Sequence, residues 1–124
     1  MNLWRALFGL AALVNLTVGG AMIIGAREVA AQLGVLGPGA PYAITMAGMM
    51  IAVFGVGYAI VSGNPAGNRG IVWIGVIGKI GACVLAAMQY AQGLIPQSTF
   101  TLGLGDAVFA ALFLLFLWRG PRPG

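Results

Sequence analysis

Four long apolar stretches constrain the fold of this chain more than any other feature. Each is close to the length of about 20 residues that an α-helix needs to cross the hydrocarbon core of a membrane. They lack the alternating pattern of a membrane β-barrel. Short connections should make consecutive helices antiparallel. We therefore expect an all-α fold, a single membrane domain over residues 1–124, in which an antiparallel bundle of four transmembrane helices covers about 3–24, 42–62, 71–92 and 101–118.

The composition indicates the same environment and limits the chemistry. Hydrophobic residues make up 60% of the chain and charged residues only 6%, whereas a soluble domain carries about 25% charged residues. With no histidine, one cysteine and two acidic residues, a single chain lacks the commonest general base and the ligands of a metal cluster. The six basic residues form no patch for nucleic acid. We expect no enzymatic activity, no cofactor, no metal and no nucleic-acid partner.

Two of the three connections carry turn chemistry. Residues 62–70, SGNPAGNRG, contain an Asn-Pro step and glycines, which favour a tight turn. In QGLIPQSTFT, Pro96 breaks the preceding helix, and Ser98 or Thr99 is the expected N-cap of the last helix.

The first connection is longer. Val29, Leu33 and Leu36 within it fall at helical spacing. This segment is either a short helix that lies in the membrane interface or an irregular loop.

Basic residues gather on one side of the expected bundle. Four spans put both termini and the second connection on the same side, and that side holds Arg5, Arg69, Arg119 and Arg122. The opposite side has only Arg27, next to Glu28. All three tryptophans also fall near the arginine-rich side. Because loops rich in lysine and arginine stay in the cytoplasm, we expect both termini there.

Lys79 and Asp106 are the ionisable residues expected deepest inside the spans. At 1.5 Å per residue, Lys79 lies roughly 12 Å, Asp106 roughly 18 Å and Asn15 roughly 16 Å from the cytoplasmic ends of their helices. A lone charge at this depth costs about 2.5 to 3.5 kcal/mol or more. We therefore expect the two opposite charges to be strongly buried and to pair inside the bundle, with Asn15 and Thr17 supplying further hydrogen bonds.

Several interpretations of these polar residues stay open. The pair either fixes helix register and partner choice or forms a functional site, as a proton or ion relay or as the anchor of a polar ligand. Alternatively, Lys79 extends to the cytoplasmic interface. Tyr58 is either an interfacial anchor or part of the site. The candidate ligand or ion-pair site is thus Lys79, Asp106, Asn15 and Tyr58, while Cys83, one turn after Lys79, is expected to be an inert thiol.

Three segments resemble a known group of proteins: FGVGYAIVSGNPAGNRG, IGVIGKIG and LGDAVFAALFLLFL. They resemble small bacterial four-transmembrane-helix proteins, loosely DoxX-like, and the likeness covers the last three helices best. In that group a tyrosine, an Asn-Arg turn, a helical lysine and a helical aspartate recur together, which here are Tyr58, Asn68, Arg69, Lys79 and Asp106. The resemblance implies a four-helix bundle in the bacterial inner membrane. Some DoxX relatives are subunits of quinone-linked oxidoreductases, but their motifs are not evident in this sequence.

These features favour a non-enzymatic structural or accessory subunit of a membrane complex. The glycine-rich helix faces suit close helix packing, and the expected partners are membrane lipids and either further copies of the chain or a larger complex. One alternative is a small transporter or channel that uses Lys79 and Asp106. Another is a binder of a hydrophobic ligand such as a quinone or a lipid. The expected location is the bacterial inner membrane, with several spans.

Overall fold

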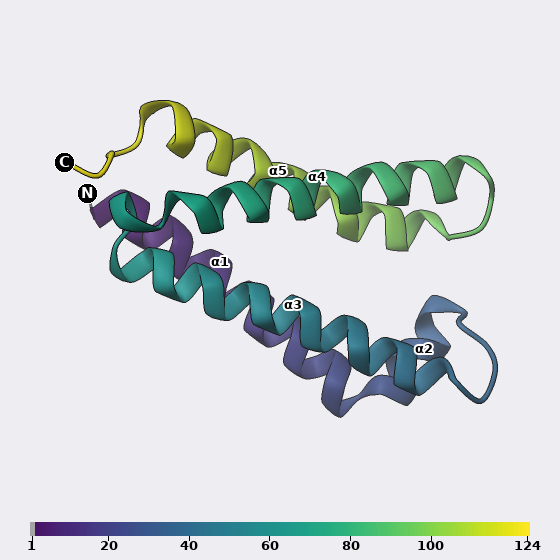
Figure 1. Cartoon of the computed structure of the whole chain (residues 1–124). Coiled ribbons are helices and arrows are strands. Elements are labelled where there is room, and N and C mark those ends of the chain that lie inside the picture. The colour runs from purple at the N-terminus through teal and green to yellow at the C-terminus, as the bar shows by residue number, and fades with distance from the viewer. Residues whose placement is uncertain (1) are drawn as a thin grey trace. The chain divides into compact units, whose positions relative to one another are not determined.

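The computed structural model describes residues 2–124, except for the side chain of Asn2. The chain is 84% helical, and no strand occurs among the described residues. A short 3-10 helix, η1, covers Ala66–Asn68. The five α-helices (Figure 1) are α1 (Asn2–Ile24), α2 (Ala26–Leu33), α3 (Ala40–Gly63), α4 (Arg69–Ala91) and α5 (Gln97–Arg119).

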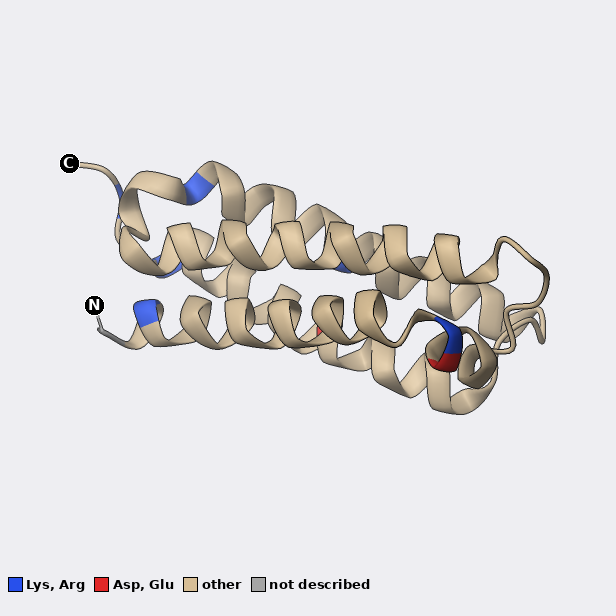
Figure 2. Cartoon of the chain, turned by 90° about the horizontal axis from the view of Figure 1, so that it is seen from below, with Lys and Arg blue, Asp and Glu red and all other residues tan. Residues whose placement is uncertain are grey.

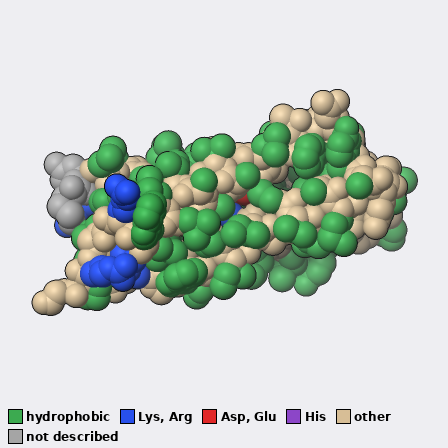
Figure 3. All heavy atoms as spheres, turned by 90° about the horizontal axis from the view of Figure 1, so that it is seen from above, with side chains coloured by type: hydrophobic (Ala, Val, Ile, Leu, Met, Phe, Trp, Pro, Cys, Tyr) green, Lys and Arg blue, Asp and Glu red, His purple; other side chains and the backbone are tan. Residues whose placement is uncertain are grey.

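The four predicted spans are present as α1, α3, α4 and α5. Each of these helices is long and apolar enough to cross a membrane, so the predicted all-α fold with four long apolar helices is confirmed. Hydrophobic side chains cover much of the helix surface in Figure 3. Charged residues are few, as the mostly tan helices of Figure 2 show. The apolar surface suits contact with lipid, which needs no hydrogen bonds from the side chains that face it.

The last long helix begins earlier than expected, and the predicted N-cap is wrong. Ser98 and Thr99 lie inside α5, which starts at Gln97 with Pro96 in an extended conformation before it. The carbonyl of Pro96 accepts hydrogen bonds from the backbone N–H groups of Thr99 and Phe100. Pro96 can take this place because a residue before the first helical turn needs no donor of its own.

The chain divides into two compact units, residues 2–63 and 64–124. In the first unit, α1 and α3 are antiparallel. The Ser62 hydroxyl donates to the Arg5 carbonyl at 2.8 Å, and the Asn15 amide donates to the Ile51 carbonyl at 3.1 Å. The first bond joins the start of α1 to the end of α3. The second joins the middle of α1 to the middle of α3. The predictions of a single domain and of a four-helix bundle concern the arrangement of both units together. Both stay predictions.

Small residues allow α1 and α3 to approach closely. A Cβ atom on Gly19 would lie 2.5 Å from the carbonyl oxygen of Gly48 and 2.7 Å from the backbone nitrogen of Ala52. Only glycine fits where two backbones come this near.

The short helix α2 packs on the start of α3. Its Ala26 and Ala30 are buried with Ala40 and Ile44 of α3, and Met22, Val29 and Leu33 border this cluster. Of the two alternatives for the first connection, the short helix is therefore present, with its apolar side against α3; its location in a membrane interface stays a prediction. The helix ends at Gly34, whose φ of 72° is left-handed, a conformation that glycine adopts without strain. Leu36 lies beyond this end and is 90% exposed, so its predicted place in the helix is wrong.

In the second unit, α4 and α5 form an antiparallel hairpin with a contact at each end. Near the connecting turn, the rings of Tyr90 and Phe100 stack with centroids 4.8 Å apart. At the other end, Arg69 donates to the carbonyls of Leu117 and Pro121. Because α5 ends here with carbonyls that lack helical partners, a cation at this place stabilises the helix end.

Candidate functional site

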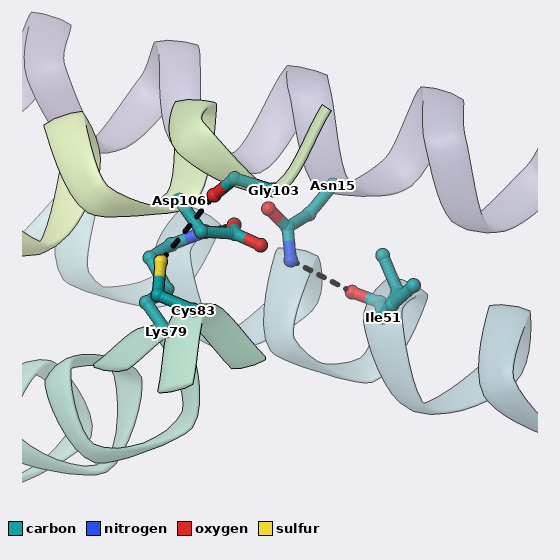
Figure 4. Close-up of polar contacts among 6 residues, drawn as sticks. All are labelled: Asn15, Ile51, Lys79, Cys83, Gly103 and Asp106. Carbon is teal, nitrogen blue, oxygen red and sulfur yellow. Dashed lines mark hydrogen bonds and ion pairs between the residues drawn. The ribbon is translucent and has the colours of Figure 1, made fainter. Parts of the chain in front are cut away.

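Lys79 and Asp106 lie near the midpoints of two antiparallel helices. Lys79 is ten residues after the start of α4, and Asp106 is nine residues after the start of α5. Each therefore has roughly 15 Å of helix before it. The antiparallel hairpin brings the two side chains together, and Nζ of Lys79 donates to Oδ1 of Asp106 at 2.8 Å. The ion pair predicted from the sequence is present (Figure 4).

The two partners differ in exposure. The Lys79 side chain is 7% exposed, whereas the Asp106 side chain is 38% exposed. The prediction that both groups are strongly buried is therefore right for the ammonium group and wrong for the carboxylate. Phe109 and Phe113 of α5 lie near the Lys79 ammonium group, whereas Gly103 and Gly105, on either side of Asp106 along α5, carry no side chains. An ideal Cβ on Gly105 would meet no atom within 4 Å.

Two aromatic rings of α5 also lie near the ammonium group. Nζ of Lys79 lies 5.2 Å from the ring centroid of Phe109 and 6.0 Å from that of Phe113. A cation over an aromatic face is attracted by the ring quadrupole, more strongly when both are shielded from water. The side chain of Lys79 is thus held beside α5 by one carboxylate and two aromatic rings. This position argues against the alternative that the side chain extends to the membrane interface.

Cys83 adds a second contact between the same helices. Its Sγ donates to the carbonyl oxygen of Gly103 at 3.3 Å (Figure 4). Cys83 lies one turn after Lys79, and Gly103 lies one turn before Asp106, so the two contacts are neighbours on the antiparallel pair. The sequence placed Cys83 on the face of Lys79, but a backbone carbonyl as its partner leaves no signal in a side-chain pattern.

Asn15 and Tyr58 belong to the other unit. The Asn15 side-chain nitrogen donates to the Ile51 carbonyl of α3, and Thr17 is exposed. Tyr58 is 1% exposed, with its ring tilted against that of Phe54. Its burial does not fit an exposed interfacial anchor. The site that combines Asn15 and Tyr58 with the Lys79–Asp106 pair stays a prediction.

The described polar contacts join neighbouring helices. Among residues 2–124, no three His, Cys, Asp or Glu side chains gather closely enough to hold a metal ion. The polar groups described above donate to carbonyls or to a carboxylate of the neighbouring helix. Such bonds stabilise membrane helices by about 0.6 kcal/mol on average. The partly exposed carboxylate of Asp106 can accept a further hydrogen bond.

The chain matches no protein-family model, and no curated protein or solved structure is significantly similar to it. The resemblance to DoxX-like proteins therefore stays a prediction.

Proposed function

We propose that this chain is a multi-pass protein of the bacterial inner membrane, with both termini in the cytoplasm, and that it acts as a non-enzymatic structural or accessory subunit. Four apolar candidate spans of 22 to 26 residues, one of which includes η1 with α4, support the insertion. The excess of arginine at the termini and in the second connection supports the orientation.

The exposed edge of Asp106 is the observation that carries the accessory role. A carboxylate that lies midway along a lipid-facing helix is costly, because lipid tails offer no hydrogen-bond donor. Lys79 neutralises one side of it, while 38% of the side chain stays exposed. A donor from a neighbouring protein chain satisfies the exposed side. The partner is either another copy of this chain or a subunit of a larger membrane complex.

The test is purification of the tagged chain from native membranes in mild detergent, followed by native mass spectrometry. We expect a complex that contains more than one chain in fixed proportion. The informative variant is Lys79→Met with Asp106→Leu, which removes both charges and leaves neither unpaired. It should remain folded and run as a single chain. The matched control Glu28→Gln changes the other acidic residue, which is exposed on α2, and should leave the complex intact.

A single chain purified from native membranes would contradict the accessory role. It would favour the second candidate function, in which the partly exposed carboxylate of Asp106 is part of an ion path or the polar anchor for a hydrophobic ligand. A double variant that still forms the complex would show that Asp106 does not make the contact.

A further inference from the structure

We propose that the arginine-rich end of the α4–α5 unit binds the headgroup of an anionic phospholipid. Arg119 and Arg122 supply the charge, and Arg69 holds the segment that carries them. This inference rests on the proposed insertion in a membrane and adds a ligand chemistry to it.

Arg69 fixes the chain that follows α5. Its Nη1 donates to the Pro121 carbonyl at 2.9 Å, and its Nη2 donates to the Leu117 carbonyl. The guanidinium group also lies 5.1 Å from the ring centroid of Phe116. Residue 120 must be glycine, because a Cβ there would overlap the Phe116 ring and carbonyl. Arg119 and Arg122 thus lie in or beside a segment that Arg69, the first residue of α4, holds by hydrogen bonds.

The charge at this end is unbalanced. Among residues 64–124, the only acidic side chain is that of Asp106. It lies thirteen residues before Arg119, or about 20 Å along the helix, and it pairs with Lys79. The planar fork of guanidinium donors on Arg119 and Arg122 matches the oxygens of a phosphate group.

The surroundings favour a lipid as the source of that phosphate. Trp73 of α4 and Trp118 of α5 are large, exposed side chains near this end. Tryptophan at such a position settles at the level of lipid headgroups. The Arg119 guanidinium lies over the Trp118 ring, 4.6 Å from its centroid, which keeps the cation at that level. The apolar helix surface next to it accommodates acyl chains.

The test compares phosphatidylglycerol with phosphatidylcholine. The full chain is reconstituted in nanodiscs of each lipid and in a mixture, and the lipids retained after release into detergent are counted by native mass spectrometry. We expect preferential retention of phosphatidylglycerol. Arg119→Gln and Arg122→Gln should each lower its affinity about fivefold, the factor expected for one basic residue beside an anionic surface.

Arg27→Gln is the matched control, because it removes the same charge from an exposed arginine on α2, next to Glu28. It should leave the retention of phosphatidylglycerol unchanged. Equal losses in all three variants would overturn the proposal, as would equal retention of the two lipids. The proposal would also be overturned if inorganic phosphate in detergent stabilised the chain against unfolding as strongly as phosphatidylglycerol does.

The outcomes separate this inference from the proposed function. A chain that enters phosphatidylcholine nanodiscs normally but shows no preference for phosphatidylglycerol overturns only the headgroup site. A chain that enters neither lipid overturns membrane insertion itself and the headgroup site with it.

Discussion

The unequal exposure of Lys79 and Asp106 sets how the pair responds to substitution. An ion that loses its partner costs more free energy when no other polar group can reach it. The ammonium group is nearly enclosed between Asp106 and the rings of Phe109 and Phe113, while the carboxylate keeps an exposed edge. Loss of the carboxylate should therefore be the more damaging change.

We expect Asp106→Leu to lower the free energy of unfolding by about 3–5 kcal/mol, the cost of stranding a buried charge. Lys79→Met should cost less, because the exposed edge of the remaining carboxylate can still accept a hydrogen bond from the proposed neighbouring chain. The double variant should be milder than Asp106→Leu alone, since no charge is left without its partner. Unfolding of each variant in detergent, followed by circular dichroism, gives the three values.

These three values form a double-mutant cycle. Strict additivity of the two single changes would contradict the pairing as a source of stability. Equal costs for the two single variants would contradict the role assigned to their different exposure.

At the scale of helices, contact between α1 and α3 depends on residues without side chains. Gly19 meets the backbone of α3 at Gly48 and Ala52. Gly20, the next residue, has nothing within 4 Å of the position that a Cβ would take. Two adjacent glycines of one helix therefore have opposite environments, although the sequence alone does not distinguish them.

Gly19→Ala should destabilise the α1–α3 pair by about 1–3 kcal/mol, the usual cost of an added carbon in a filled contact. The added Cβ would force the two backbones apart. Gly20→Ala is the matched control and should be neutral or slightly stabilising, because alanine favours a helix over glycine. Thermal unfolding in detergent compares the two variants, and similar unfolding temperatures for both would contradict the close approach at Gly19.

Local sequence predicted the helices better than their ends. Apolar length alone located α1, α3, α4 and α5, since crossing a membrane requires a continuous run of apolar residues. The helical spacing of Val29 and Leu33 predicted α2. Leu36 continued that spacing but follows Gly34, whose left-handed conformation ends the helix. At such an end, backbone conformation takes precedence over side-chain periodicity.

At the scale of the whole molecule, the distribution of arginine predicts the orientation in the membrane. In a background of Cys83→Ser, single cysteines can be placed at three exposed positions: Leu36, Leu94 and Gly124. We expect a membrane-impermeant thiol reagent to label Leu36→Cys and Leu94→Cys from the periplasmic side of intact spheroplasts. Gly124→Cys should react only after the membrane is opened.

The pattern of labelling has distinct consequences. Labelling of Gly124→Cys alone in intact spheroplasts would reverse the orientation. Labelling of residues 36 and 94 on opposite sides would contradict four crossings.

The amino-acid sequence by itself determined the helical, apolar character of this protein and the need of Lys79 for an opposite charge. Both follow from a rule that applies residue by residue, namely the cost of placing polar groups in lipid. Only the tertiary structure decided that Asp106 keeps an exposed edge, that Asn15 bonds Ile51 and that Arg69 holds the end of α5. These features depend on which backbone atoms of a second helix lie opposite each side chain, and backbone carbonyls are the same at every residue.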